Sequence, residues 1–347
     1  VLGEDGFKMS KSRGNVTVPE EILSQYGADS LRQWAAAGAA TGSDIQFNWN
    51  DVVAANRFLT KMWNISRFAL MQLSRETYDP SAPVTALADR WLLTRLDATV
   101  REVSEAFETY QFDKGLRAIR EFAWDVLADN YIEIVKGRLY GGAGRDGACV
   151  AIKTALDALC RMLAPYTPYF AEEIWSSVGE GSVHKQPWID FSYQDSDAIE
   201  SGQILVRVVS EVRRYKHDNN LALNAPLGEI TVYTSRAVDD AGDGGLALNC
   251  SLKFLEGRPE LKEVVTGVSF NMGIIGPALR GQAKGFMQAV DAMPKEMLVN
   301  LPETVKVVDE MIAIPEGSVI PKMSYTVAGA AVEIITAEPD LTITIAR

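Results

Sequence analysis

Residues 92–126 read LLTRLDATVREVSEAFETYQFDKGLRAIREFAWDV and contain two stripes of apolar side chains. In both stripes the apolar residues recur at steps of three or four, which is the spacing of one face of an α-helix. The first stripe consists of Leu92, Leu96, Val100, Val103, Phe107 and Tyr110, and the second of Phe112, Leu116, Ile119, Ala123 and Val126. Because the break at residues 109–113 is short, the sequence predicts two neighbouring antiparallel helices.

The helical pattern extends on both sides, over residues 51–178. Residues 141–144 are rich in glycine and indicate a loop before a helix at 146–163, and Pro165 and Pro168 interrupt the chain again. The sequence therefore predicts a bundle of four or five long helices. We expect its core to contain four tryptophans on the helical stripes, Trp63, Trp91, Trp124 and Trp175.

The first fifty residues have a different character. A loop rich in glycine, lysine and serine leads to Pro19, a residue favoured in the first turn of a helix. Gly27 is expected to end that helix, since glycine adopts the left-handed conformation found after a helix C-terminus. A second helix is expected from residue 28 to about residue 40.

The pattern changes again after about residue 199. A helix at 204–216 is followed by strand-like runs at 229–233, 264–268, 304–307, 331–335 and 341–345, with helical pieces near 246–256 and 277–292. The predicted fold is mainly α, with the helical bundle followed by a small mixed α/β domain. We expect three domains, at residues 1–50, 51–190 and 199–347, with a polar linker near 182–198.

Composition and charge limit the classes of protein to which this chain can belong. The chain has 347 residues, which is long for a single core, and a net charge of −12, which argues against indiscriminate binding to nucleic acid. It has no run of eighteen apolar residues, so we expect no membrane partner. Three widely spaced cysteines indicate a reducing, cytoplasmic location. With only His184 and His217 and no Cys-x-x-Cys, we expect no bound metal ion.

The strongest local signal is Lys8-Met9-Ser10-Lys11-Ser12. Two lysines three residues apart, with serines between and beside them, suit a flexible clamp for phosphate groups, because each ammonium is a mobile point charge. A solvated basic turn is the alternative for an arbitrary pair of this kind. These five residues, however, resemble the KMSKS signature of class I aminoacyl-tRNA synthetases. Residues 6–7, 14–16 and 26–32 also match the surroundings of that signature.

The resemblance implies the chemistry of the loop. The family uses it during amino-acid activation, which implies ATP binding by Lys8, Met9, Ser10, Lys11 and Ser12. Lys8 and Lys11 are implied as the catalytic residues that stabilise the pyrophosphate. Where the family often has Ile-Asp-Pro after the signature, this chain has Thr17-Val18-Pro19. The missing acid affects no catalytic role that we identify.

The bundle narrows the resemblance to the valyl-tRNA synthetases. Residues 58–68, 89–96, 106–112 and 163–175 are similar to helices of that family, whereas the tail resembles the archaeal type. The resemblance implies the C-terminal portion of a valine–tRNA ligase. Residues 1–50 would be the end of its Rossmann-type catalytic domain, and the bundle at 51–190 would bind the anticodon of the tRNA. The intact enzyme would use ATP with Mg²⁺ to activate valine, would transfer it to valine tRNA, and would be a monomer.

Two alternatives remain open. The first is a fragment of an isoleucyl- or leucyl-tRNA synthetase, and the second is a non-catalytic tRNA-binding module. The family also needs a His-x-Gly-His motif, which a chain with two distant histidines cannot contain. We therefore expect the nucleotide-binding half to lie outside this chain, and the chain to be inactive alone.

Basic residues on the predicted helices are candidates for contact with the tRNA backbone. The first group, at positions 114, 117 and 120, recurs every third residue and therefore shares one helix face. The second group, at positions 136 and 138, lies at the end of the next helical stretch. The third group, at positions 207, 213, 214 and 216, is the densest basic patch. A solvated face and complementation of the helix dipole are the alternatives for the first two groups. The candidates are Lys114, Arg117, Arg120, Lys136, Arg138, Arg207, Arg213, Arg214 and Lys216.

Overall fold

The computed structural model describes residues 1–38, 42–298, 300–308 and 310–346. By its internal contacts the chain divides into two units. Unit 1 comprises Val1–Ala225 and Val238–Asn249, and unit 2 comprises Pro226–Ala237 and Cys250–Arg347. The chain therefore passes between the units at residues 225–226, 237–238 and 249–250. The three domains expected from the sequence stay a prediction.

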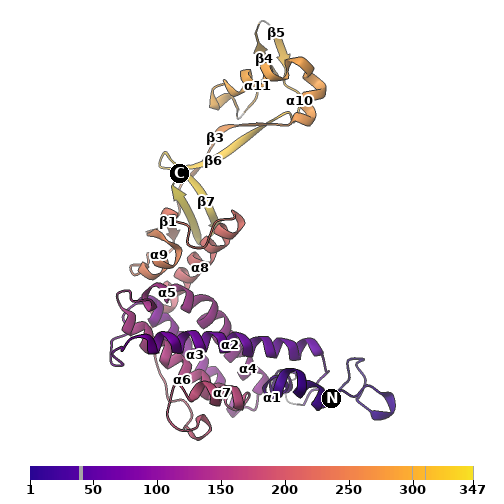
Figure 1. Cartoon of the computed structure of the whole chain (residues 1–347). Helices are drawn as coiled ribbons and strands as arrows, with labels where there is room; N and C mark the ends of the chain where they lie inside the picture. The colour runs from indigo at the N-terminus through magenta and orange to yellow at the C-terminus, as the bar shows by residue number, and fades with distance from the viewer. Residues whose placement is uncertain (39–41, 299, 309, 347) are drawn as a thin grey trace. The chain divides into compact units, whose positions relative to one another are not determined.

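Unit 1 is helical, as Figure 1 shows, and the predicted helical bundle is confirmed. In the described residues α3 packs against α4, α6 and α8, and α1 packs against α2 and α4. A π-helical segment, Phe122–Tyr131, joins α4 to α5. The helices of unit 1 are α1 (Pro19–Ala37), α2 (Trp49–Arg75), α3 (Leu87–Glu108), α4 (Phe112–Glu121), α5 (Ile132–Leu139), α6 (Arg145–Leu163), α7 (Pro168–Trp175), α8 (Ser196–Asp218) and α9 (Gly242–Leu248).

The apolar stripes form the core of the bundle, with three corrections, of which the first is that Phe112 at the start of the second stripe is 40% exposed. Leu92, Leu96 and the rest of the first stripe up to Val103 are buried. Tyr110 is not part of that face, because α3 ends at Glu108 and Tyr110 lies in the following turn with φ 56° and an exposed side chain. Trp63 was expected in the core but is 41% exposed on α2.

Two glycines explain local geometry. Gly27 has φ 76° and divides α1 into two helical pieces, as the sequence predicts. The second piece ends at Ala37, and residue 40, near which its end was expected, lies outside the described residues. Gly202 on α8 lets that helix approach α3, since a Cβ atom there would lie 2.5 Å from the buried ring of Trp91.

Unit 2 is built on a mixed sheet with the strand order β2-β1-β8-β7-β6-β3. β1 pairs parallel with β2 and antiparallel with β8, and the remaining neighbours are antiparallel. A separate antiparallel pair is formed by β4 and β5. The strands are β1 (Gly228–Thr234), β2 (Cys250–Glu256), β3 (Leu261–Phe270), β4 (Thr304–Val307), β5 (Glu310–Ala313), β6 (Val319–Val327), β7 (Ala330–Glu338) and β8 (Leu341–Ala346).

The predicted mixed α/β region is confirmed, but one element was wrong. Residues 246–256 were expected to be helical, whereas α9 ends at Leu248 and residues from Cys250 form strand β2. The apolar residues Leu252 and Phe254 alternate with polar ones, which is the period of a strand. Pairing with β1 satisfies the backbone of this short segment. β5 and β6 were not expected from the sequence.

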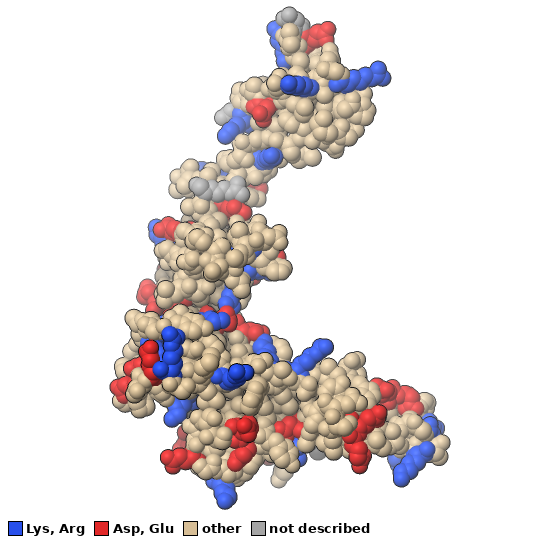
Figure 2. Space-filling model, in the orientation of Figure 1, with Lys and Arg blue, Asp and Glu red and all other residues tan. Residues whose placement is uncertain are grey.

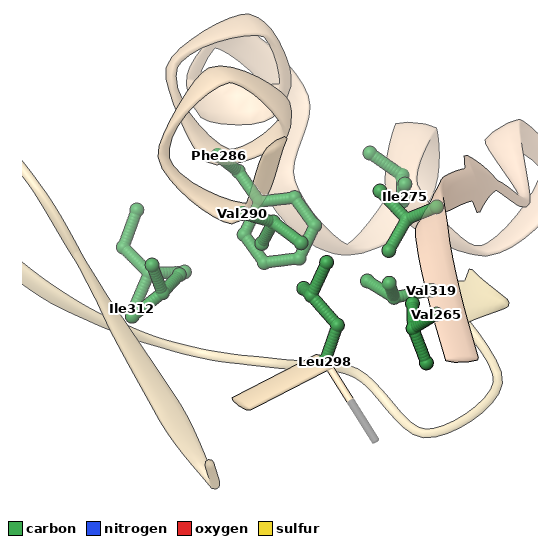
Figure 3. Packing of buried hydrophobic residues seen from close by; sticks show 9 residues of the cluster. Val265, Ile275, Phe286, Val290, Leu298, Ile312 and Val319 are labelled. Carbon is green, nitrogen blue, oxygen red and sulfur yellow. The ribbon is translucent and has the colours of Figure 1, made fainter. Parts of the chain in front are cut away.

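A compact apolar cluster forms a second core within unit 2 (Figure 3). Phe286 and Val290 of α11 (Ala283–Asp291) point toward Ile275 of α10 (Met272–Leu279) and Leu298. Val265 of β3 and Val319 of β6 close the cluster beside the sheet. This core explains why the β4–β5 pair can stand outside the main sheet, since Val305 and Ile312 pack into it.

A buried ionic network ties three helices of unit 1 together. The guanidinium of Arg138 on α5 donates to both carboxylate oxygens of Asp89 on α3, at 2.9 and 2.6 Å. Its Nε lies 2.8 Å from Oδ1 of Asp243 on α9, and the hydroxyl of Tyr131 donates to Asp89 at 2.7 Å. Burial raises the pKa of Asp243 to about 6, although the Arg138 charge opposes this shift. Two carboxylates thus share one guanidinium.

A buried lysine fixes the place where the chain leaves unit 1. Lys216 of α8 is fully buried, and its ammonium donates to the carbonyl oxygens of Leu223, Ala225 and Leu248 at 2.8, 2.8 and 2.6 Å. Ala225 is the last residue before the first passage to unit 2, and Leu248 ends α9 before the third. One charge therefore holds the C-terminal end of α8, the following loop and α9.

The Arg138 network yields a first prediction. Arg138→Ala removes the only guanidinium that the structure shows between Asp89 and Asp243 in the described residues, and leaves buried carboxylates without compensation. The free energy of unfolding should fall by about 3–5 kcal/mol, measured by urea denaturation at pH 7. The control is Arg214→Ala, an exposed residue of α8 paired with Glu211, which should cost less than about 0.5 kcal/mol. Equal losses in the two variants would contradict the network's role.

The raised pKa of Asp243 yields a second prediction. Its carboxyl takes up a proton near pH 6 in the folded chain but only near its ordinary pKa of 3.8 in the unfolded chain, so falling pH stabilises the fold through this group. Relative to Asp243→Asn, the wild type should gain about 1 kcal/mol of unfolding free energy between pH 7 and pH 5. Urea midpoints at both pH values measure this difference. A pH-independent difference would show that Asp243 does not titrate there.

Candidate functional site

The loop at residues 8–12 is attached to the body of unit 1 through its neighbours. Leu2 forms isolated β-bridges with Lys8 and Gln46, and its backbone exchanges hydrogen bonds with Ile45 and Phe47 at 2.7 and 2.9 Å. The side chain of Met9 packs beside the buried cluster that contains Phe47. The loop is therefore fixed at its first two residues, Lys8 and Met9.

Hydrogen bonds made by the side chains of Asn15 and Asp5 stabilise the conformation of the loop. The side-chain oxygen of Asn15 accepts from the backbone N–H of Ser10 at 2.8 Å, and its amide donates to both carboxylate oxygens of Asp5 at 3.1 Å. Asp5 also accepts from the backbone N–H of Phe7 at 3.0 Å. The backbone hydrogen bond from Phe7, followed by that from Asn15, lowers the pKa of Asp5. From the sequence, Asn15 was noted only as part of the motif around the loop, and the role of Asp5 in stabilising the loop was not identified.

The charged ends of the loop remain available to a ligand. Lys8 and Lys11 are exposed, and neither forms an ion pair within the residues that the structure describes. A short 3₁₀ turn, Lys11–Arg13, follows, and the hydroxyls of Ser10 and Ser12 lie 2.7 Å apart. The two ammonium groups and two hydroxyls belong to one turn, so they form a set of donors suited to phosphate oxygens.

Helix α1, which follows the loop, is docked on the bundle by polar contacts. Oδ2 of Asp29 accepts from the backbone N–H of Phe170 at 2.7 Å, in the first turn of α7. Arg32 donates to the carbonyl oxygens of Pro165 and Tyr166 at 2.7 and 3.1 Å. Both contacts use backbone groups that helix ends leave without a partner. The loop and the bundle are thereby joined through one helix.

The predicted tRNA contacts fall into two groups, of which one is solvent-facing. Lys114 and Arg117 are exposed on α4, and Arg117 lies 3.5 Å from Asp113. Lys136 and Arg213, on α5 and α8, both pair with Glu133, at 3.3 and 2.8 Å. Arg214 is exposed and pairs with Glu211, and Arg207 is partly buried on α8. Figure 2 shows basic and acidic side chains intermixed on the face that it draws.

The other group is turned inward. Arg138 and Lys216 are buried in the contacts described above, with 5% and 0% exposure. Arg120 is partly buried and donates twice to Oε1 of Gln33 on α1, at 2.6 and 3.1 Å. A side chain already bound inside the fold cannot follow a phosphate on the surface, so we leave Arg138 and Lys216 out of the proposed tRNA surface. The sequence placed them by helix position, which does not reveal the partner of a buried charge.

Among the described residues, no group of three or more His, Cys, Asp or Glu side chains is arranged to hold a metal ion. No helix in the described ranges is both long and apolar enough to cross a membrane.

Comparison with known families gives two separate matches. Residues 1–48, which include the basic loop, match the family described as "tRNA synthetases class I (I, L, M and V)". Residues 89–232 match the family described as "Anticodon-binding domain of tRNA ligase". The boundary between the two matches falls within α2 and the segment after it.

Curated relatives extend the similarity over most of the chain. The valine–tRNA ligase of Archaeoglobus fulgidus is 46% identical over 303 residues, which are 85% of this chain and 35% of that protein. The valine–tRNA ligase of Methanosarcina mazei is 45% identical over 302 residues, or 84% of this chain and 34% of that protein. A solved ternary complex of Agrobacterium radiobacter K84 agnB2 LeuRS with tRNA and LeuAMS has a TM-score of 0.45 and 22% identity, covering 57% of this chain and 23% of that one.

The chain thus spans about a third of the length of the relatives that it matches. The two family matches include the basic loop and the helical bundle, and the curated relatives cover more than four fifths of the chain. The chain is therefore a homologue of the archaeal valine–tRNA ligases that corresponds to about a third of such a protein.

Proposed function

We propose that this chain is the C-terminal part of a valine–tRNA ligase that activates valine with ATP and transfers it to valine tRNA. The observation that carries the proposal is the 46% identity to such a ligase over 85% of the chain. The similarity to the two family descriptions supports the same conclusion. Mg²⁺ as the companion of ATP, a monomeric state and a cytoplasmic location belong to this proposal.

In this proposal the basic loop stabilises the pyrophosphate that leaves when valine attacks ATP. Lys8 and Lys11 supply positive charge, and Met9, Ser10 and Ser12 complete the ATP-binding loop. The exposure of both lysines and their lack of ion pairs in the described residues support this role. The anchoring of the loop by Asn15 and Asp5 keeps the donors in one turn before the ligand arrives.

The helical bundle would bind the tRNA. Its match to an anticodon-binding domain supports contact with the anticodon loop, whose unstacked bases can be read on their edges and faces. Lys114, Arg117, Lys136, Arg207, Arg213 and Arg214 would contribute contacts with phosphate groups. A second candidate function, a tRNA-binding module without catalysis, describes what this chain would do in isolation.

The loop proposal predicts a catalytic effect. We would fuse this chain to the part of the Archaeoglobus fulgidus ligase that it does not match, and measure valine-dependent exchange of pyrophosphate into ATP. Lys8→Ala with Lys11→Ala should lower kcat by about 10²–10³-fold, because donors aimed at developing charge are lost. Lys153→Ala, an exposed lysine on α6, is the control and should leave the exchange rate unchanged.

Exchange by the fused protein that is equally fast with and without Lys8 and Lys11 would refute the role of the loop. The chain without the fused part should show no exchange, since it carries only the loop half of the ATP site. Exchange by the isolated chain would instead refute the proposal that it is only part of the enzyme.

The bundle proposal predicts selective binding. The chain should bind valine tRNA more tightly than valine tRNA carrying the isoleucine anticodon, measured by filter binding. Affinity for both should fall as salt rises, because counterions are released from the phosphates. Equal affinity for the two tRNAs at every salt concentration would favour a general RNA-binding module. Tighter binding of isoleucine tRNA would favour the isoleucyl alternative.

A further inference from the structure

A pocket of about 480 Å³ lies between α2 and the α4–π-helix segment of unit 1. Each wall comes from one helix face, with residues at spacings of three and four. From α2 it is lined by Ala54, Arg57 and Phe58, and from the facing segment by Arg117, Arg120, Glu121, Trp124 and Asp125. Sequence reasoning placed Arg117 and Arg120 on one surface stripe but gave no reason to bring Arg57 to them.

Aromatic rings form one side of this pocket. Phe58 and Trp124 lie nearly parallel, with centroids 6.5 Å apart and an interplanar angle of 18°. Nζ of Lys61 lies 3.8 Å from the centroid of Trp124 and 2.6 Å from Oδ1 of Asp129, so the indole contacts both a ring and a cation. The wall is therefore fixed before any ligand binds. π-helical segments such as the one that carries Trp124 are frequent at functional sites.

Three guanidinium groups face the same space with different freedom. Arg120 is held by Gln33 and lies 5.7 Å from the centroid of Phe58. Arg57 is exposed and makes no ion pair with the described residues. Arg117 is 70% exposed, and its contact with Asp113 is long, at 3.5 Å. One fixed and two mobile guanidinium groups can adapt to the planar or tetrahedral oxygens of an anion.

The two acidic residues of the lining do not cancel these charges. Glu121 lies 3.8 Å from Nη2 of Arg95, outside the set of three arginines. Burial, with the nearby charges of Asp129 and Glu121, raises the pKa of Asp125. The lining residues thus carry three positive and at most two negative charges beside an apolar wall. A ligand that combines an anion with a flat apolar surface matches this arrangement.

We propose that this pocket binds one nucleotide of the tRNA, with Arg57, Arg117 and Arg120 on its phosphate and Phe58 and Trp124 beside its ribose or base. The proposal rests on tRNA binding by this chain, as argued above, and adds a defined site for the RNA backbone. Arginine pairs with phosphate through two parallel hydrogen bonds, and an apolar aromatic wall accepts a nucleotide whatever its base. The contact positions the RNA without reading its sequence.

The test compares variants of the full chain for binding to valine tRNA across a salt series. Arg57→Gln with Arg117→Gln should weaken binding about 10-fold, and should reduce the slope of log affinity against log salt by about 0.7–0.9, the value for one phosphate. Arg67→Gln is the matched control, because Arg67 is an exposed arginine ten residues, about 15 Å, further along the same helix. Its affinity should stay within about twofold of the wild type.

Ethylation interference then identifies the phosphate. One tRNA phosphate should weaken binding of the wild-type chain when ethylated, and have no effect on the double variant. If the wild type binds valine tRNA and the double variant binds equally well, the pocket proposal is wrong and tRNA binding stands. Equal loss in the Arg67→Gln control would likewise overturn it, since general charge would then explain the effect. A wild-type chain that binds no tRNA would overturn both proposals.

Discussion

The bundle depends on charges that are buried rather than exposed. Arg138 joins α3, α5 and α9 by meeting Asp89 and Asp243 in a space from which water is excluded. Such a site is costly unless every charge has a partner, because desolvation of an ion costs several kcal/mol. The network therefore fixes one arrangement of these helices. Lys216 likewise fixes the C-terminal ends of α8 and α9, because its buried ammonium donates hydrogen bonds to three carbonyl oxygens.

Because the fold uses some basic side chains internally, fewer of them are available to bind a ligand. Of the basic residues that helix position selected, Arg138 and Lys216 serve the fold, Arg120 is shared between Gln33 and a pocket, and Arg117 remains largely exposed. A strongly acidic chain thus confines its available cations to small areas. Local basic surfaces on an acidic body favour specific contacts over general attraction to nucleic acid.

Helix α1 links the two proposed activities. It follows the basic loop and carries Asp29, Arg32 and Gln33, which reach α7, the turn before it and Arg120 on α4. Gln33 holds the arginine that lines the proposed nucleotide pocket. A change in how RNA fills that pocket would therefore act on the same helix that carries the loop. The physical connection is a short series of hydrogen bonds within unit 1.

The sequence by itself determined the helical stripes, the break at Gly27, the glycine-rich turn before α6 and the basic loop, because these depend on residues close together in the chain. It misjudged Tyr110, Trp63 and the helix expected at 246–256, where the local pattern was ambiguous and a turn, the solvent or the neighbouring strand β1 decided the outcome. Only the tertiary structure brought Arg57 to Arg117 and buried Arg138 beside Asp243. A charge finds its partner by the packing of distant helices, and no spacing along one chain segment encodes that distance.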